Sequence, residues 1–449
     1  MKTNKKHAGL SAIAVLLAAV FLLLALPVGA EDGTDTDTDD GAPPVIDHCV
    51  GAYLYNFEND EVLYSYGEDE RVYPTSTVKL MTGIVAIEAL GDDLTKQVTI
   101  TGEMLSKVAG NNVGLMAGEN VTVEQLLYAM LVNSANDAAT VLAYAAYGSV
   151  EAFVEKMNDK ANALGAYDTY YANPTGMHND AMVTTVADTA IIAKYAYKIP
   201  LFMEIVSTPK YVMEATNLSD YRNIYNRNCL LSKYYNVNYP YPRATGMNAG
   251  ATSQGGYAIC ATAEDSATGL SYLAIVMGAD EVEAKIYSYV NAIKLFEWAF
   301  NHFDYIEVLS SDRIICELPV RLSSTLDYVT LVPSETIEVY LPTTVDVERD
   351  IRYSYNTYED AMDAPITTGE EAGTITVLMG DRILGSCTLV TTSNVARSEF
   401  LYFLARVRVF SQSRFFIATV IAAVVLSIAY VLLKSYLREK HIRSRMNRR

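Results

Sequence analysis

The sequence predicts an α+β domain, in which an antiparallel sheet is flanked by helices, followed by a small all-β domain and one transmembrane helix. Residues 78–164 contain helical segments, and residues 49–66 and 244–277 contain strand-like segments on either side of them. After Phe303 the chain changes to short alternating segments separated by turns, as in an all-β domain. Phe415–Leu433 is a run of 19 residues without formal charge, long enough to span a bilayer.

The N-terminus contains two segments that we expect to lie outside the folded domains. Lysines and the apolar run Leu10–Leu26 precede the small residues Val28–Ala30, which is typical of a cleaved secretory signal. We therefore predict a signal peptide at 1–30 and a mature chain that begins near Glu31, with an uncleaved N-terminal anchor as the alternative. The segment that follows, placed at 31–45, is acidic and poor in core-forming side chains, which predicts a disordered linker.

The first folded domain, placed at 46–305, begins with a predicted strand pair. Apolar and polar residues roughly alternate over residues 49–66, as in two strands joined by a turn. Pro74 then marks a boundary, after which apolar residues crowd Val78–Leu90 with few charges. This pattern predicts a mostly buried helix, with the residues just after Pro74 at its N-terminus.

Helices are predicted to dominate the middle of this domain. Val123–Tyr147 has a helical pattern that is interrupted at Asn133–Asn136, and Val150–Leu164 is a further helix with acids and lysines on one side. Three strand-like segments follow and are expected to pair in an antiparallel sheet. These segments are Ala244–Ala251, Tyr257–Ala263 and Tyr272–Met277.

The C-terminal part of the chain divides into four predicted segments. They are a β domain at 306–397, a juxtamembrane segment at 398–414, a transmembrane helix at 415–433 and a basic tail at 434–449. The tail carries seven basic residues against the single acid Glu439, and the positive-inside rule therefore places it in the cytoplasm. We expect a single-pass protein of the cell membrane with an extracellular ectodomain.

The ectodomain is strongly acidic. Of the 34 basic residues, 3 precede position 31 and 10 follow position 400, so residues 31–400 carry 21 bases against 52 acids, a formal charge of −31. Such a field argues against nucleic acid or anionic lipid as a partner of this region. Divalent or polybasic partners can still approach it.

The cysteine and histidine content argues against several kinds of site. Five scattered cysteines without a Cys-x-x-Cys pair argue against a disulfide framework. Only His48, His178 and His302 lie in the ectodomain, too few for the usual three-ligand zinc site. The same scarcity disfavours a Ser-His-Asp triad, which needs a histidine base.

Ser76-Thr77-Val78-Lys79 places a hydroxyl and an amine three positions apart, within reach on one face of a helix. Lys79 can serve as the base for Ser76 when its amine is neutral, which requires its pKa to fall from about 10.4. Burial in the apolar helix supplies such a shift, and the helix N-terminus favours a developing oxyanion. The four-residue pattern also occurs by chance, so its weight comes from its surroundings.

Ser134 and Asn136 are alternate residues in the break between two predicted helical stretches. Both side chains can therefore point the same way, one relaying a proton and the other holding a substrate amide. Helix capping is the alternative explanation for these two residues.

The surroundings of both motifs, from about Val45 to Arg397, resemble the serine D-alanyl-D-alanine carboxypeptidases, the low-molecular-mass penicillin-binding protein family. Tyr73–Thr82 is similar to the family's Pro-Ala-Ser-x-Thr-Lys-x-Met-Thr. Further similar segments are Val113-Gly114-Leu115, Gly118-Glu119, Leu131–Ala139, Asn173-Pro174-Thr175-Gly176-Met177-His178, and Ala364-Pro365-Ile366 with Gly369 and Gly373.

The resemblance implies a β-lactamase/transpeptidase-like fold and a peptidase that acts on the D-Ala-D-Ala end of peptidoglycan stem peptides. It implies an acyl-enzyme on Ser76 that water resolves, Lys79 as the base, and Ser134 and Asn136 as the second element. The implied oxyanion hole is the backbone N–H of Ser76 and of Ala251. β-Lactams are further possible ligands, and no metal or cofactor is implied.

The third motif departs from the family pattern. Where the family has Lys-Thr-Gly and, after one residue, Thr, this chain has Asn248-Ala249-Gly250 followed by Ala251 and Thr252. The segment Ala244-Thr245-Gly246 is an alternative match, but the spacing to Thr252 favours Asn248–Gly250. By resemblance, Asn248, Ala249 and Gly250 join Asn136 as substrate-binding residues.

The two replaced side chains have a physical consequence. In the family the lysine and threonine hold the substrate's terminal carboxylate, and a charge-assisted hydrogen bond of this kind contributes about 1.5–3 kcal/mol. We therefore expect weaker carboxylate binding, a less depressed pKa of Lys79, and activity that moves to higher pH. Arg243 or Asn248 is expected to replace part of the lost contacts, and Gly250 to let the substrate backbone lie close to the strand.

Two functions from different classes remain open. One is a membrane-anchored carboxypeptidase, slowed by the altered motif and favoured by the intact Ser76 and Lys79. The other is a catalytically inactive protein that binds or senses cell-wall peptides, favoured by Asn248 and Ala249. A β-lactamase is disfavoured because Ala172–Met182 contains no glutamate to activate a deacylating water.

Overall fold

The computed structural model describes residues 41–446 of the chain. The predicted signal peptide at 1–30 and most of the predicted linker at 31–45 therefore lie outside the described residues. Residues 41–47 contain neither helix nor strand.

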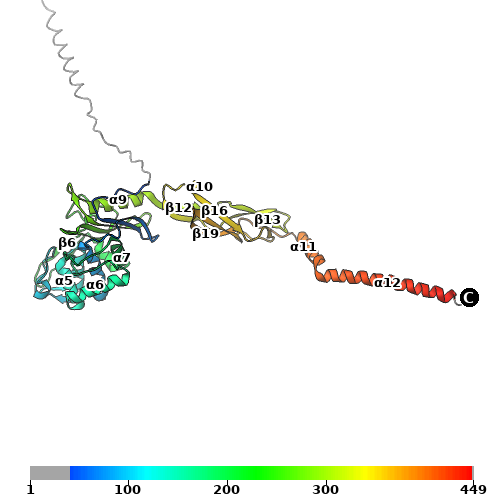
Figure 1. Ribbon diagram of the computed structural model, residues 1–449, viewed down its shortest axis with the longest axis horizontal. Helices are drawn as coiled ribbons and strands as arrows, with labels where there is room; N and C mark the ends of the chain where they lie inside the picture. Colours follow the sequence, from blue (N-terminus) through cyan, green and yellow to red (C-terminus); the bar gives the residue numbers. More distant parts are fainter. Residues whose placement is uncertain (1–40, 447–449) are drawn as a thin grey trace, which may run out of the picture. The chain divides into compact units, whose positions relative to one another are not determined.

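A five-stranded antiparallel sheet organises the first domain (Figure 1). Its strands lie in the order β2, β1, β9, β8, β7, so β7 is an edge strand. The predicted N-terminal strand pair and the three later strands are all confirmed. Their bounds are Gly51–Asn56 for β1, Glu61–Tyr66 for β2, Ala244–Thr252 for β7, Gly256–Glu264 for β8 and Ser271–Ala279 for β9.

Helices cover both faces of this sheet, as the alternation of buried side chains along β9 shows. Leu273 and Ile275 pack against the helices α2 to α8, whereas Tyr272 and Ala274 pack against α9. Figure 1 shows α5, α6 and α7 together on one side of the sheet and α9 on the other. The helices are α2 Val78–Leu90, α3 Gly102–Leu105, α4 Val123–Asn133, α5 Asn136–Tyr147, α6 Val150–Leu164, α7 Val186–Tyr197, α8 Pro200–Val206 and α9 Tyr287–His302.

The helix α2 lies at the centre of the helical layer. Its residues Val78–Ile87 and Leu90 are buried, which confirms the prediction made from its nearly continuous apolar sequence. The buried set includes one ionisable side chain, Lys79, which is 1% exposed. A charged group in such a place is costly, so its presence here indicates a chemical role.

The first domain also contains three two-stranded sheets. The hairpin of β5 and β6 leads directly to Arg227, a residue of the site described below. The pairs are β3 Gln97–Thr99 with β4 Asn120–Thr122, β5 Lys210–Met213 with β6 Arg222–Tyr225, and β10 Glu281–Val282 with β11 Lys285–Ile286.

A second region is built almost entirely of strands around its own apolar core. A six-stranded sheet has the order β16, β18, β19, β14, β13, β17, and β12 pairs with β15. The bounds are β12 Phe303–Leu309, β13 Cys316–Arg321, β14 Tyr328–Pro333, β15 Ile337–Pro342, α10 Val347–Asp350, β16 Ile351–Thr357, β17 Met362–Asp363, β18 Glu371–Met379 and β19 Arg382–Thr391. The hydroxyls of Tyr272 and Tyr340, 2.8 Å apart, join this region to α9 and the first sheet.

Two helices end the described chain. The predicted juxtamembrane segment contains α11, Glu399–Gln412, and the predicted membrane span lies within α12, Arg414–Met446. Among the described residues, Arg414–His441 is the one helix long and apolar enough to cross a membrane.

Candidate active site

Ser76 lies in a short 3-10 turn, Thr75–Thr77, that leads directly into α2. The turn is closed by Thr77, whose hydroxyl donates to the Pro74 carbonyl at 2.6 Å. Thr75 has a φ of +49°, a left-handed conformation that costs a β-branched residue about 1–3 kcal/mol. The neighbouring loop and strand must therefore hold this turn, and Ser76 with it, in place.

Lys79 follows three residues after Ser76, in the first turn of α2, and is buried. Burial is the main cause that lowers the pKa of its amine to about 7, and the nearby charge of Arg227 lowers it further. The ammonium donates a hydrogen bond to the carbonyl of Thr175. Near neutral pH a large fraction of Lys79 is therefore the free base. This lowered pKa does not require a lysine in the third motif.

The loop Asn173–His178 forms one wall beside Ser76. The Asn173 carboxamide accepts hydrogen bonds from the N–H groups of Thr175 (3.0 Å) and Gly176 (2.9 Å), which folds the loop back on itself. Gly176 has a φ of +81°, and a Cβ there would lie 2.0 Å from the Thr75 carbonyl oxygen. Only glycine fits at this close contact between the loop and the nucleophile turn.

Ser134 and Asn136 lie at the junction of α4 and α5, as the broken helical pattern predicted. Ser134 has a left-handed φ of +58°, and the Asn136 side chain donates to the Ala109 carbonyl at 2.7 Å. The capping explanation holds in part: Ser134 is the C-cap of α4 through its backbone N–H, whereas α5 has Ala135 at its N-cap and no side-chain cap bond. Asp137 fixes the facing loop by accepting from the N–H of Leu115 at 3.1 Å.

The strand β7 forms the opposite wall, and Gly250 lies directly against Ser76. A Cβ on Gly250 would lie 2.2 Å from the Ser76 hydroxyl oxygen. Gly250 therefore makes room for the Ser76 side chain, and its expected role toward the substrate backbone stays a prediction. Asn248 shares this face, is 3% exposed, and its side-chain oxygen is buried without a hydrogen-bond partner.

Ala249 points the other way. Its methyl group belongs to the apolar cluster beneath α9, together with Ile259, its neighbour on β8. Its side chain therefore does not join Ser76. In the alternative motif, Thr245 bonds the Thr262 hydroxyl at 2.9 Å and Gly246 packs near Val206, so that segment lies elsewhere on the strand.

The prediction that Arg243 replaces the missing cation is wrong. Arg243 pairs with Asp265 at 3.1 Å and lies over the ring of Phe300, 4.5 Å from its centroid. Both partners lie on the α9 side of the sheet. The side chain is therefore occupied away from Ser76.

The cation that faces Lys79 is Arg227, which follows β6 and which the sequence analysis missed. Its guanidinium lies over the Tyr235 ring, 4.1 Å from the centroid, and donates to the side-chain oxygen of Asn111 at 2.6 Å. Its backbone N–H donates to the Val132 carbonyl at 2.9 Å, next to the Ser134 turn. Burial and Arg227 thus lower the pKa of Lys79 without a lysine in the third motif, and the expected shift of activity to higher pH stays a prediction.

Comparison with known proteins agrees with this geometry. Residues 47–281, just over half of the chain, match the family model of the D-alanyl-D-alanine carboxypeptidases, and residues 303–397 match the C-terminal domain of penicillin-binding protein 5. The chain belongs to the D-alanyl-D-alanine carboxypeptidase family. The resemblance and the fold class drawn from the sequence are thus confirmed, and the family is one of hydrolases.

Relatives in this carboxypeptidase family match over different lengths of the chain. D-alanyl-D-alanine carboxypeptidase DacF of Bacillus subtilis is 26% identical over 402 residues, 88% of this chain and 97% of the relative. A D-alanyl-D-alanine carboxypeptidase of Streptomyces sp. is 34% identical over 200 residues, 41% of this chain and 68% of the relative. The structure of penicillin-binding protein 5 from Haemophilus influenzae superimposes with a TM-score of 0.56 at 25% identity, covering 79% of this chain and 99% of that one.

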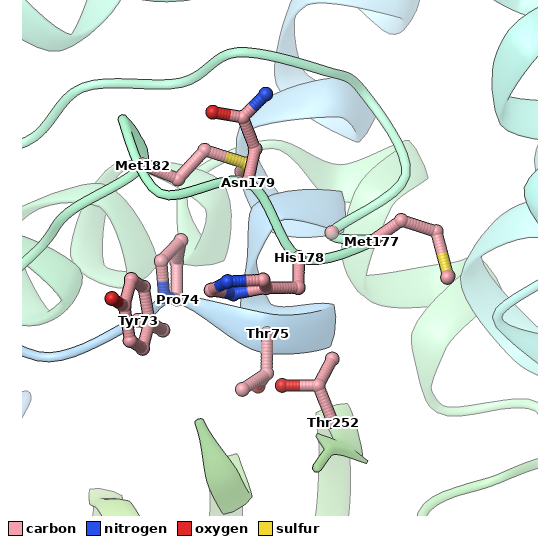
Figure 2. A pocket seen from close by; sticks show the side chains of 9 residues that line it. Tyr73, Pro74, Thr75, Met177, His178, Asn179, Met182 and Thr252 are labelled. Atoms are coloured by element: carbon pink, nitrogen blue, oxygen red, sulfur yellow. The ribbon is translucent and has the colours of Figure 1, made fainter. Parts of the chain in front are cut away.

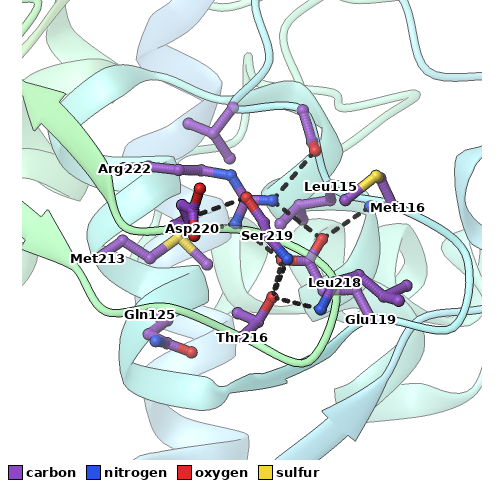
Figure 3. Close-up of polar contacts among 12 residues, drawn as sticks. Leu115, Met116, Glu119, Gln125, Met213, Thr216, Leu218, Ser219, Asp220 and Arg222 are labelled. Carbon is purple, nitrogen blue, oxygen red and sulfur yellow. Dashed lines mark hydrogen bonds and ion pairs between the residues drawn. The ribbon is translucent and has the colours of Figure 1, made fainter.

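A buried ion pair beside the carboxypeptidase site ties the hairpin that precedes Arg227 to the helical layer (Figure 3). Arg222 on β6 contacts Glu119 at 2.8 Å, and the Glu119 side chain is fully buried. Burial raises the pKa of Glu119, but hydrogen bonds from Arg222, Thr216 and the Met116 N–H outweigh it and lower the pKa. Breaking such a pair by removing one partner typically costs about 3–5 kcal/mol.

Three groups of the site were not singled out from the sequence: Arg227, Asn111 and the Thr175 carbonyl. The signal available in the sequence was the segment Asn226-Arg227-Asn228, in which a cation lies between two asparagines. The ectodomain contains few arginines, so this one could have been singled out. The Asn226 side chain donates to the carbonyls of Val206 and Thr208, each at 3.0 Å, which holds Arg227 in position. Only the fold brings this segment to Lys79.

Proposed function

We propose that this protein is a serine D-alanyl-D-alanine carboxypeptidase that cleaves peptidoglycan stem peptides through an acyl-enzyme on Ser76. The observation that carries the proposal is Lys79, whose amine is buried with its pKa lowered to about 7. A buried amine that titrates near neutral pH destabilises the fold and suits a general base. Its retention therefore favours turnover over a binding role.

The proposed first half-reaction assigns a role to each of these groups. Neutral Lys79 accepts the proton of the Ser76 hydroxyl, and the oxygen attacks the carbonyl carbon of the penultimate D-alanine. The backbone N–H groups of Ser76 and Ala251 stabilise the oxyanion. As the peptide C–N bond breaks, the proton passes through Ser134 to the departing amine, and D-alanine leaves.

The second half-reaction is hydrolysis. Water attacks the ester carbon, its proton returns through the same groups, and the Ser76 hydroxyl is restored as the shortened peptide leaves. Asn136 holds the amide of the acyl part through its carboxamide. A cavity of about 500 Å³ offers room for the rest of the stem peptide, and it is lined in part by Thr140, Thr175 and Met177.

In this proposal Arg227 receives the substrate's terminal carboxylate in place of the family's lysine. Its Nε is buried without a hydrogen-bond partner, whereas its other end is fixed by Asn111 and Tyr235. A guanidinium held in this way can pair with a carboxylate at little further cost in side-chain entropy. Asn248 contributes at most a neutral hydrogen bond.

The remaining assignments concern the location of the protein. α12 anchors the chain, the basic tail at 434–449 lies in the cytoplasm, and the acidic ectodomain faces the cell wall. The domains run from 46 to 305 and from 306 to 397, the second serving as a spacer above the membrane. Penicillins are expected as acylating ligands.

An inactive protein that binds cell-wall peptides is the second candidate. The specific observation in its favour is Asn248, a neutral residue whose buried oxygen has no partner where the family has a lysine. In that case the cleft would bind peptide and the serine would not be acylated. The two candidates differ in one measurable event, the formation of an ester on Ser76.

The deciding experiment is the intact mass of the full chain in detergent after incubation with a penicillin. Wild type, Ser76→Ala, Asn248→Lys and Ala249→Thr are compared. We expect a drug-sized mass gain on wild type and none on Ser76→Ala, with faster acylation of Asn248→Lys. Ala249→Thr is the control, because its hydroxyl would enter the apolar cluster beneath α9.

No gain on wild type together with a gain on Asn248→Lys would contradict the proposal and support the binding protein. Where acylation is found, release of D-alanine from a pentapeptide is the next measurement. Acylation without such release would also count against the carboxypeptidase.

A further inference from the structure

A small cavity lies beside the turn Thr75–Thr77 that carries Ser76 (Figure 2). Its volume is about 10 Å³, the space of one water molecule. Two of its polar atoms, the Thr75 hydroxyl oxygen and His178 Nδ1, are buried without a hydrogen-bond partner in the structure. The lining residues are Tyr73, Pro74, Thr75, Gly176, Met177, His178, Asn179, Met182 and Thr252.

The orientation of His178 gives this cavity a hydrogen-bond acceptor. Its Nε2 lies 2.9 Å from the Asp180 carboxylate, and its ring meets the Tyr73 ring edge to face at 4.7 Å between centroids. The carboxylate can only accept, so Nε2 carries the proton. In this tautomer Nδ1 presents its lone pair to the cavity.

Two threonines complete the cavity, and each is the neighbour of a proposed oxyanion-hole residue. Thr75 precedes Ser76 along the chain, and Thr252 follows Ala251. In Figure 2 the Thr252 hydroxyl points toward Thr75. Thr252 already accepts the Gly255 N–H at 3.0 Å, and a Cβ on Gly255 would lie 2.4 Å from the Thr75 methyl group. The end of β7 therefore packs directly on the nucleophile turn.

We propose that one water molecule occupies this cavity and bridges His178, Thr75 and Thr252, and that His178 is thereby a positioning residue for the oxyanion hole. The water donates to Nδ1 and to the Thr252 oxygen and accepts from the Thr75 hydroxyl. Both buried atoms of the cavity that lack a partner, His178 Nδ1 and the Thr75 hydroxyl oxygen, thereby gain one. It joins the left-handed Thr75 to the strand end, and so fixes the spacing of the Ser76 and Ala251 N–H groups. This role rests on the proposed acyl-enzyme chemistry.

The geometry favours positioning over general-base catalysis by His178. Ser76 is not among the residues that line the cavity, and its hydroxyl lies against Gly250 instead. A water held at Nδ1 therefore contacts the turn at Thr75, not at the Ser76 hydroxyl. Both half-reactions form an oxyanion in the same hole, so loss of the bridge slows both of them.

The test compares His178→Asn, His178→Gln and His178→Ala in the full chain. The asparagine carboxamide can place an acceptor where Nδ1 lies, whereas glutamine reaches toward the Nε2 position. We expect acylation by penicillin and hydrolysis of the acyl-enzyme each to slow about tenfold in the glutamine and alanine variants, less than the 10²–10³-fold of a deleted oxyanion donor. The asparagine variant should retain both rates and the wild-type pH profile.

Slowing of hydrolysis alone, with a changed pH profile, would overturn positioning in favour of a base for the water. Equal loss in the asparagine and alanine variants would also overturn it, as would unchanged rates in all three. The water itself is tested by a crystal structure of wild type, where density within hydrogen-bond distance of the three groups is expected. If wild type is never acylated, the proposed function fails, and the crystal structure still decides whether the bridge exists.

Discussion

The two walls of the cleft differ in how their sequence determines their chemistry. The helical wall carries Ser76, Lys79 and the Ser134–Asn136 junction, and its key property, a lowered pKa of Lys79, arises mainly from burial in an apolar layer. The strand wall, β7, keeps the close contact of Gly250 with Ser76 but has a neutral residue, Asn248, where the family has a lysine.

This difference indicates that activation of the nucleophile and recognition of the carboxylate are separable. Burial depends on dozens of apolar contacts and tolerates the loss of one charge, whereas recognition of a carboxylate depends on one or two charged groups. Arg227 belongs to neither wall in the sequence; its charge lowers the pKa of Lys79, and under the proposed function it also receives the substrate carboxylate. Variants that act on one wall alone should separate the two.

The largest effect is expected from Lys79→Met, which should remove acylation and stabilise the fold. Loss of a general base typically costs about 10²–10⁴-fold in rate. The folded-state pKa is about 7 and the unfolded value is about 10.4, so between these values the unfolded chain binds more protons and wild-type stability rises with pH. Below pH 7 the full cost of burying the charge remains. In this range the free energy of unfolding of the variant should exceed that of wild type by the largest amount.

Urea unfolding between pH 6 and 10, alongside acylation rates, measures both outcomes. Wild type should gain up to about 1.4 kcal/mol per pH unit within this range relative to the variant. Lys285→Met, at an exposed position on β11, is the matched control and should change neither quantity. A Lys79→Met protein with unchanged pH dependence of stability would show that the amine is not neutral in the folded state.

A smaller effect is expected from Gly250→Ala, which acts on the strand wall. The new Cβ would lie 2.2 Å from the Ser76 hydroxyl oxygen, so the nucleophile must move. Displacement of a reacting atom by about 1 Å can cost 10²-fold, and we expect an acylation rate lower by about that factor. Stopped-flow acylation with a chromogenic cephalosporin measures it.

Gly102→Ala is the control for Gly250→Ala, since a Cβ at Gly102 meets nothing within 4 Å. Its acylation rate should equal that of wild type. An unchanged rate in Gly250→Ala would mean that Ser76 moves freely, which would contradict the view that the strand wall fixes the nucleophile.

The helical wall was predictable from the sequence because its signals are local. Val78–Leu90 and the break at Asn133–Asn136 follow from apolar periodicity and its interruption, and both were found where expected. The orientation of Ala249 was not predictable, because a one-residue step along a strand reverses the face and the motif gives no register. Arg227 was missed for a related reason: an electrostatic interaction across 148 positions of sequence, from Lys79 to Arg227, has no local pattern.

The smallest effect is expected from Arg227→Gln. This variant tests the comparison of the two walls most directly. Loss of the charge should weaken carboxylate binding and raise KM about tenfold, within the range of a charge-assisted hydrogen bond. It should also raise the pKa of Lys79, because one of the two causes that lower it is removed. At any pH near 7 less of the lysine is then neutral, so the acid limb of the rate profile moves to higher pH.

Arg227→Lys separates charge from geometry in this prediction. The ammonium keeps the repulsion on Lys79 but loses the planar donor that Asn111 and Tyr235 hold, so KM should rise while the acid limb stays in place. D-alanine release measured from pH 5 to 9 gives both parameters for each variant. If the acid limb moves equally in both variants, the shift comes from altered packing around Asn111, and the charge of Arg227 does not link the two walls.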